Sequence, residues 1–233
     1  TIRKASVAAG EAGGITQHIS AYQTKKHKEL ITFIDTPGHA DFSGEVERTL
    51  RVADGVSLVV DAQEGPMPQT KFVLSKALQL ELRPIVVSNK IDKTASRIAQ
   101  VENELADLFL ELAVHEDQLH YPVYYAIGRE AKSWTTPPAD PTEPADLIPI
   151  FKAITEHVPA PTIELGGNLQ LLVSALRYDS FQGKYSVGRV ERGSVKKGYA
   201  VVLMTETGQV KSKIDRIYRT VGTNFFEIDS AVA

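Results

Sequence analysis

The chain has 233 residues, of which 42% are hydrophobic, which is enough for one large domain or two ordinary ones. Its 26 Lys and Arg residues are balanced by 29 Asp and Glu, so the net charge of −3 excludes a general electrostatic attraction to nucleic acid. The absence of cysteine excludes disulfides, thiolate metal sites and cysteine nucleophiles, and no apolar run is long enough to span a membrane. We expect a soluble, cytoplasmic protein with no membrane partner, and a monomer.

The first part of the chain alternates strand patterns with amphipathic helix patterns. Strands are predicted at 30–35, 55–61, 83–89 and 121–126, and helices at 44–52, 69–80, 98–112 and 146–157. The strand runs are nearly all apolar or β-branched, which is typical of parallel strands buried on both faces, and the run from Leu30 to Asp35 is predicted to be one of them. This alternation predicts an α/β fold with an open, mostly parallel sheet and right-handed crossovers.

The character of the sequence changes after a Pro-rich surface loop at 135–144 and a helix that ends before Pro161. Short alternating strands are then predicted at 169–176, 184–191, 199–205 and 209–218, separated by glycine-containing turns. Such a pattern predicts a small antiparallel β-barrel. We expect one domain over residues 1–162 and a barrel domain, incomplete at its C-terminus, over residues 163–233.

The stretch Asp35-Thr36-Pro37-Gly38-His39 follows the first of the predicted apolar strands. The carboxyl ends of strands in an open α/β sheet face the ligand crevice, so Asp35 is placed where a carboxylate could hold a water of Mg²⁺. The N–H of Gly38 can approach an anion closely because glycine has no Cβ, and His39 beside a terminal phosphate could orient an attacking water. The alternative is an ordinary strand-turn-helix connection whose aspartate caps the turn.

A second polar motif, Asn89-Lys90-Ile91-Asp92, follows the predicted strand 83–89. The Asp92 carboxylate can accept two N–H donors from the edge of a guanine, while Asn89 can bond the base and brace the loop. The aliphatic stem of Lys90 can cover the ring. The alternative is a polar turn, in which Asn and Asp are common. Two such motifs in this order, each at a strand end, favour a nucleotide site.

These two motifs resemble the third and fourth signature motifs of the translational GTPases. The stretch from Asp35 to Asp92, together with ADLIPIFKAITEHVPAP and LQLLVSALRYDSFQGKYSVGRVERGSVKKG, resembles the BipA/TypA family of ribosome-associated GTPases. This resemblance implies a P-loop GTPase-type sheet followed by a β-barrel of the translation-factor domain II type. It also implies binding of GTP and GDP with Mg²⁺, hydrolysis of GTP with His39 positioning the water, and the ribosome, both RNA and proteins, as partner.

Two segments carry further expectations from the resemblance. Residues 8–19, AAGEAGGITQHI, resemble the first switch of bacterial initiation factor 2, which implies that Thr16 ligates Mg²⁺ through its hydroxyl, in the site where Asp35 is the carboxylate. Ala126, Ile127 and Gly128 stand where the family has a Ser-Ala pair that contacts guanine. Their backbone N–H groups are expected to serve the base instead.

The chain departs from the family in having no G-x-x-x-x-G-K-[ST] sequence, the loop that cradles the β and γ phosphates. We expect an N-terminally truncated GTPase domain that binds GTP poorly by itself and hydrolyses it negligibly. Two alternatives remain open. The chain is a non-catalytic ribosome- or protein-binding module, or its parent is a relative of initiation factor 2.

Basic residues gather on one predicted hairpin of the barrel: Arg189, Arg192, Lys196 and Lys197. Because related factors pack this barrel against small-subunit RNA, this hairpin is the expected RNA contact.

Overall fold

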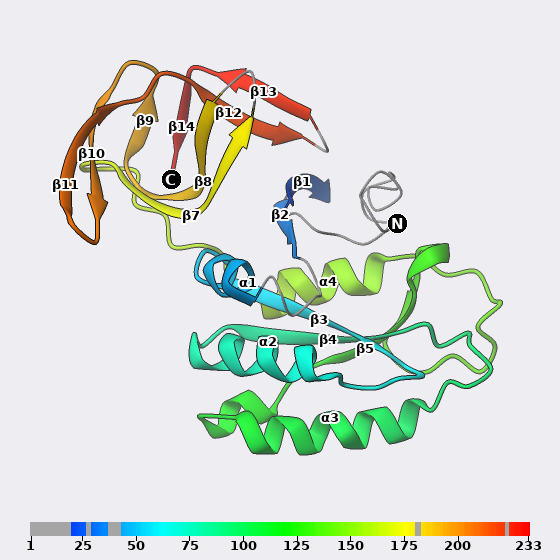
Figure 1. Cartoon of the computed structure of the whole chain (residues 1–233). Coiled ribbons are helices and arrows are strands. Elements are labelled where there is room, and N and C mark those ends of the chain that lie inside the picture. Colours follow the sequence, from blue (N-terminus) through cyan, green and yellow to red (C-terminus); the bar gives the residue numbers. More distant parts are fainter. Residues whose placement is uncertain (1–19, 27–28, 37–42, 180–182, 222–223) are drawn as a thin grey trace. The chain divides into compact units, whose positions relative to one another are not determined.

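The computed structural model describes residues 20–26, 29–36, 43–179, 183–221 and 224–233, and Figure 1 shows the course of the chain. Contacts between Cα atoms group the described residues into two units, one within 36–160 and one made of 20–35 with 161–233. The segment 20–35 thus groups with the residues after 160, whereas the predicted division places it with residues 1–162. The division into domains at 162/163 stays a prediction.

The first unit is built on the sheet β3-β4-β5-β6. Strands β3 (Gly55–Asp61), β4 (Arg83–Asn89) and β5 (Val123–Ile127) are parallel, and the short β6 (Lys132–Trp134) pairs antiparallel with β5. The predicted mostly parallel α/β sheet is confirmed. Strand β6 was not predicted, because three residues are too few to show a periodic pattern.

Helices cover both faces of this sheet. They are α1 (Ser43–Leu50), α2 (Pro68–Gln79), α3 (Ile98–Leu112) and α4 (Ile148–His157), with short 3₁₀ turns η4 (Glu116–Leu119) and η5 (Gly128–Glu130). Figure 1 shows α2 and α3 on one face of the sheet and α4 on the other. Among the described helices, none has the length and apolar character that crossing a bilayer requires.

The core of the first unit lies on either side of β4. On one face, Val86 packs with Leu74 of α2 and with Leu105 and Phe109 of α3. On the other face, Ile85 and Val87 pack with side chains of α4. Because successive strand residues point to opposite faces, a run that is apolar throughout needs a helix layer on both sides.

The N-terminal hairpin differs from its prediction. Strand β2 (Glu29–Asp35) lies where a strand was expected, but in the described chain its hydrogen-bonded neighbour is β1 (Ser20–Lys26), antiparallel, with Phe33 stacked on Tyr22. Leu30 is 63% exposed, so the expectation of a parallel strand buried on both faces is wrong. An apolar run in the sequence indicates a strand, but it does not reveal which segment pairs with that strand in the folded chain.

The second unit also contains eight strands that follow residue 169: β7 (Gln170–Asp179), β8 (Gly183–Arg192), β9 (Ser194–Lys196), β10 (Ala200–Thr205), β11 (Gly208–Lys213), β12 (Ile217–Val221), β13 (Asn224–Ile228) and β14 (Ser230–Val232). They pair antiparallel as β7-β8, β9-β14, β10-β11 and β12-β13. The antiparallel character predicted for the barrel is confirmed. Over the described residues, the strand ladders join these strands in pairs rather than in one closed ring.

Single backbone hydrogen bonds extend two of these pairs beyond the ends of their strands. The N–H of Gly198 donates to the Ile214 carbonyl at 2.7 Å, and the N–H of Lys197 donates to the Asp229 carbonyl at 3.0 Å. Gly193 has φ +72°, and a Cβ there would lie 2.8 Å from the Gly167 carbonyl oxygen, so this turn requires glycine. The predicted strand 209–218 is interrupted between β11 and β12.

The two leucines of α3 provide a test of this packing. Leu105 is 1% exposed in the core and Leu110 is 67% exposed on the same helix. We expect Leu105→Ala to lower the free energy of unfolding by about 2–5 kcal/mol, because it removes buried methyl groups and leaves a cavity. Leu110→Ala should change it by less than about 0.5 kcal/mol. Urea unfolding of both variants measures this difference, and equal losses would contradict the described packing.

Candidate functional site

The carboxyl ends of β3, β4 and β5 meet at one edge of the sheet. In the strand register, Asp61 at the end of β3 lies opposite Asn89 at the end of β4, and Asn89 lies opposite Ala126 of β5. The loops that leave these ends carry the predicted residues Lys90, Asp92 and Gly128. The carboxyl edge is where ligands bind in open α/β sheets, so the fold brings one of the two predicted motifs to a suitable place.

Asn89 links two of these loops. Its Oδ1 accepts the backbone N–H of Gly128 at 2.9 Å, which ties the end of β4 to the segment after β5. A Cβ on Gly128 would lie 3.2 Å from the same Oδ1, so glycine leaves room for the amide. The predicted bracing role of Asn89 rests on this contact, while its role toward a base stays a prediction.

Lys90 is held by the end of β3. Its backbone has φ +62°, a left-handed conformation that is costly for a residue with a side chain. Its Nζ lies 2.5 Å from Oδ2 of Asp61, whose Oδ1 accepts the N–H of Gln63 at 2.8 Å. Sequence reasoning did not single out Asp61, although its place at the end of an apolar strand is the same signal that identified Asn89.

The pair Asp61–Lys90 has shifted pKa values. Burial raises the pKa of the Asp61 carboxyl, but the bonds from Lys90 and from the N–H of Gln63 more than offset this, and the pKa lies below its ordinary 3.8. The hydrogen bond to Asp61 raises the pKa of Lys90 above its ordinary 10.5. Both groups are therefore charged at neutral pH, and the Lys90 side chain is oriented along the sheet edge.

Asp92 faces a cation that was not predicted. Its Oδ2 lies 2.9 Å from Nη2 of Arg129, and its side chain is only 15% exposed. Arg129 also lies 3.4 Å from Glu130, which is paired at 3.1 Å with Lys132. The sequence signal that was available is that Arg129 directly follows the predicted Ala126-Ile127-Gly128 segment.

Arg97 braces the loop after β3 and was also missed. Its Nε donates to the Gln63 carbonyl at 2.8 Å, its Nη2 donates to the Glu64 carbonyl at 2.7 Å, and its guanidinium is paired with Glu104 of α3. These bonds hold the segment that carries Asp61. A single arginine just before a helix shows no periodic signal, so only the fold reveals this role.

The other predicted site residues are placed as follows. Ala126 and Ile127 are 3% and 2% exposed, with side chains in the core, so only their backbones are available at the edge. Asp35 ends β2 in the second unit and is exposed. Thr16, Gly38 and His39 lie outside the described residues.

A Mg²⁺ site was predicted at Thr16 and Asp35. In the part of the chain that the structure describes, no group of three or more His, Cys, Asp or Glu side chains is placed to hold a metal ion. Because Thr16 lies outside the described residues, this Mg²⁺ site stays a prediction.

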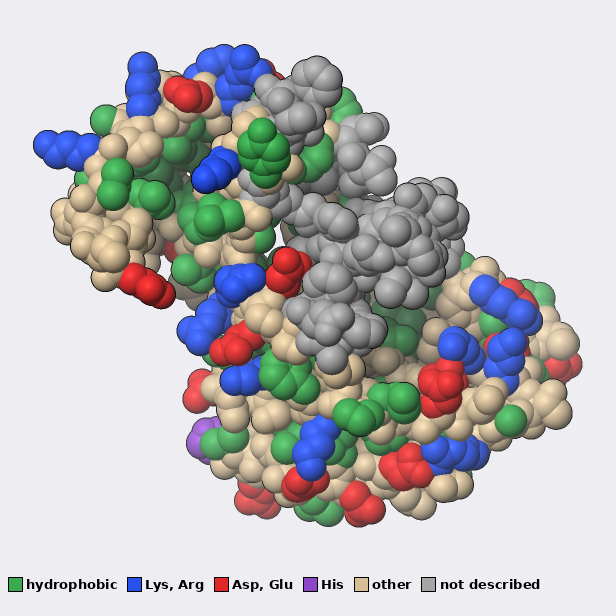
Figure 2. Space-filling model, viewed as in Figure 1, with side chains coloured by type: hydrophobic (Ala, Val, Ile, Leu, Met, Phe, Trp, Pro, Cys, Tyr) green, Lys and Arg blue, Asp and Glu red, His purple; other side chains and the backbone are tan. Residues whose placement is uncertain are grey.

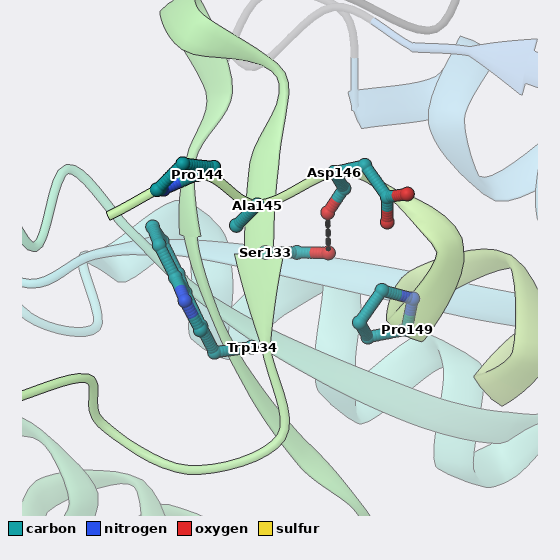
Figure 3. Close-up of a pocket in the computed structure, with 6 residues that line it drawn as sticks. All are labelled: Ser133, Trp134, Pro144, Ala145, Asp146 and Pro149. Atoms are coloured by element: carbon teal, nitrogen blue, oxygen red, sulfur yellow. Dashed lines mark hydrogen bonds between the residues drawn. The ribbon is translucent and has the colours of Figure 1, made fainter. Parts of the chain in front are cut away.

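A shallow hollow of about 490 Å³ lies beside β6, lined by Ser133, Trp134, Pro144, Ala145, Asp146 and Pro149 (Figure 3). The Ser133 hydroxyl donates to the Asp146 carbonyl at 2.8 Å, and the Asp146 carboxylate accepts the N–H of Ile148 at 2.8 Å. These polar groups already hold the Pro-rich loop and the start of α4. None of the predicted site residues lines this hollow.

Comparison with known proteins agrees with this geometry. Residues 4–160 match the elongation factor Tu GTP binding domain family. The chain belongs to this family. The nucleotide fold expected from the sequence is thus confirmed, and the edge that carries Asn89 and Asp92 lies within the matched GTP binding domain.

Individual relatives specify which of the translational GTPases this chain resembles. The large ribosomal subunit assembly factor BipA of Bacillus subtilis is 44% identical over 205 residues, covering 87% of this chain and 33% of that protein. BipA of Escherichia coli K12 is 40% identical over 221 residues, covering 94% and 36%, and BipA of Synechocystis is 43% identical over 207, covering 88% and 34%. The predicted BipA/TypA resemblance is confirmed. The chain spans about a third of the length of these relatives.

A solved structure supports the fold. A crystal structure of a protein from Thermus thermophilus superposes with a TM-score of 0.64 at 20% identity, covering 94% of this chain and 43% of that one. The likeness extends over nearly the whole GTP binding domain and the strands after it. At this level of identity it shows the fold alone.

The Asp61–Lys90 pair gives a prediction in pH. Because its folded pKa is lowered, Asp61 adds stability above pH 3.8 that is lost as pH falls through the lower folded value. Lys90→Met should raise the pKa of Asp61 by removing its cation. A carboxyl ¹³C titration by NMR measures this value, and Lys93→Met, at an exposed position of the same loop, is the control. An unchanged Asp61 pKa in Lys90→Met would contradict the pairing.

Proposed function

We propose that this chain binds guanine nucleotides at the edge formed by β3, β4 and β5. The observation that carries the proposal is the Asn89 bond to the Gly128 N–H, because it holds the loop after β4 and the loop after β5 together around the Asp92 carboxylate. Asp92 accepts the N1–H and the 2-amino group of guanine, and adenine has no such pair of donors at this edge. Membership of the GTP binding domain family supports this choice of ligand.

The loops after β4 and β5 provide the other proposed contacts to the base. Lys90 is oriented by Asp61, and its aliphatic stem covers one face of the ring. The backbones of Ala126, Ile127 and Gly128 line the side of the base, since the side chains of the first two point into the core. Preference for guanine therefore comes from one carboxylate held by a rigid backbone.

We further infer that GTP hydrolysis is the reaction that this site serves. The roles assigned to His39 in positioning the attacking water and to Gly38 in binding the terminal phosphate come from their match to the family motif. Mg²⁺ is proposed as well: Thr16, in the segment that resembles the first switch of initiation factor 2, would ligate it through its hydroxyl, and Asp35 would hold one of its waters. Because its sequence contains no G-x-x-x-x-G-K-[ST] loop, we expect this chain by itself to hydrolyse GTP negligibly.

We infer that the partner of this protein is the ribosome. We also infer that the protein acts in the cytoplasm and that it is a monomer. The names of the relatives, large ribosomal subunit assembly factors, support the ribosome. The basic hairpin of the second unit offers phosphate contacts, although Arg189 lies 3.7 Å from Glu191 and Lys197 lies 2.8 Å from Glu227. Acidic and basic side chains intermingle over the α/β unit in Figure 2, so its visible face is not a broad basic surface.

A change of base specificity tests the guanine site. Asp92→Asn replaces an acceptor by a side chain that can also donate, which suits the 2-oxo group of xanthine. We expect GDP to bind wild type more tightly than XDP or ADP, and the variant to lose GDP affinity by roughly 5- to 150-fold while gaining XDP affinity. Calorimetric titration of each nucleotide measures the change.

The control is Asp117→Asn, which removes a charge at an exposed position of η4 and should leave the preference unchanged. Equal affinity of wild type for GDP, XDP and ADP would contradict guanine recognition. Binding to ribosomes in the absence of any nucleotide binding would instead favour the alternative of a non-catalytic module.

A further inference from the structure

The carboxylate expected to receive the base is already occupied by a side chain of the same chain. Asp92 is paired with Arg129 at 2.9 Å, and the two side chains differ in exposure, 15% for Asp92 and 65% for Arg129. The acid is therefore enclosed, while the guanidinium reaches it from the solvent side.

The chemistry of the two donors is the same. A guanidinium presents parallel N–H groups in a plane, and the N1–H and 2-amino group of guanine form the same kind of planar donor pair. The bond from Arg129 uses Oδ2 of Asp92, and two-point recognition of guanine uses both carboxylate oxygens. The base and Arg129 thus compete for one acceptor.

The backbone keeps Arg129 next to Asp92. Arg129 lies in η5, directly after Gly128, whose N–H is held by Asn89. Ala131, which follows this turn, has φ +57° and donates its N–H to the Gly128 carbonyl at 3.3 Å. Consequently only the Arg129 side chain, and not its backbone, has to move when a ligand arrives.

Glu130 is a second carboxylate that can accept Arg129 when a base displaces it from Asp92. Oε1 of Glu130 lies 3.4 Å from the same Nη2 of Arg129, and Glu130 is held in place by Lys132. Lys132, the largest contributor, and Arg129 together lower the pKa of Glu130, which is ionised at neutral pH. Arg129 lies between two carboxylates, one for the closed and one for the open arrangement.

We propose that Arg129 is an internal competitor of guanine, which occupies Asp92 in the empty site and moves to Glu130 when the base binds. This inference rests on the proposed function only in taking Asp92 as the base acceptor. It makes Arg129 a specificity-determining residue, because a base with two donors gains contacts to both carboxylate oxygens when it replaces the single bond from Arg129. A base with a single donor at that edge replaces the ion pair between Asp92 and Arg129 by one weaker hydrogen bond.

The test uses guanosine, which carries no phosphate, so that removing a positive charge does not change a phosphate contact. Dissociation constants are measured by ¹H–¹⁵N NMR titration of this chain, following the Gly128 amide, with adenosine as the comparison ligand. Arg129→Leu should bind guanosine roughly two- to fivefold more tightly than wild type, the range expected for loss of one partly exposed ion pair. Glu130→Gln should bind it more weakly, because Arg129 then loses its alternative partner.

The matched control is Arg51→Leu. Arg51 is 58% exposed and paired with Glu47 at 3.5 Å, so it loses the same charge from a similar ion pair. It precedes β3, whose opposite end carries Asp61, and guanosine affinity should be unchanged. If this variant also bound more tightly, net charge and not competition at Asp92 would be the cause, and the proposal would be overturned.

The remaining outcomes distinguish a failure of the guanine site from a failure of the competitor role of Arg129. Equal guanosine affinity in wild type and Arg129→Leu overturns the competitor role and leaves the guanine site in place. Absence of guanosine-dependent shifts in wild type and in both site variants overturns the guanine site, and the competitor role with it. If Arg129→Leu fails to fold, Glu130→Gln decides, and an affinity equal to or higher than that of wild type overturns the proposal.

Discussion

The burial of β4 on both faces is the constraint on which the first unit depends. Its residues from Ile85 to Ser88 are at most 4% exposed, with helices on either side and β3 and β5 as hydrogen-bonded neighbours. A shift of the strand by one residue would exchange the two faces and place Ser88 where Val87 packs against the α4 side. The position of Asn89, at the end of this strand, is therefore set by the packing of the whole unit.

Beyond Asn89, ion pairs organise the loops at the carboxyl edge of the sheet. Lys90 holds Asp61, Arg129 holds Asp92 and Arg97 holds Glu104. Ion pairs that are partly exposed to solvent add little stability. Their effect here is orientation, and a ligand of suitable charge can rearrange them at low cost. The apolar strands provide the rigid frame, and the charged loops provide the part that adapts.

The second unit follows a different physical principle. Most of its strands have exposed side chains, and residues of β10 and β11 are exposed along nearly their whole length. Val195 is its one strongly buried apolar residue among those described, so turns and backbone hydrogen bonds contribute much of its order. The same exposure leaves basic and apolar side chains available to a large partner.

The sequence by itself determined the parts of this protein that depend on local order. Runs such as Ile85 to Val87 predicted buried strands, the spacing of Val101, Leu105 and Leu108 predicted a helix face, and two short motifs at strand ends favoured a nucleotide site, which their resemblance to the translational GTPases made specific. These properties are written in neighbouring residues, because side-chain period and backbone preference act over a few positions. The strand partners of β2 and β6 were not readable in this way.

Only the tertiary structure decided which distant side chains meet. The bond of Asn89 to Gly128 joins residues 39 positions apart, and the pair of Asp92 with Arg129 crosses from the loop after β4 to the loop after β5. Neither contact has a periodic or compositional signature, since each depends on two loops leaving the same edge of a folded sheet. The sequence indicated Asp92 as the acid that we propose recognises the base, and the fold revealed Arg129 as the cation paired with it.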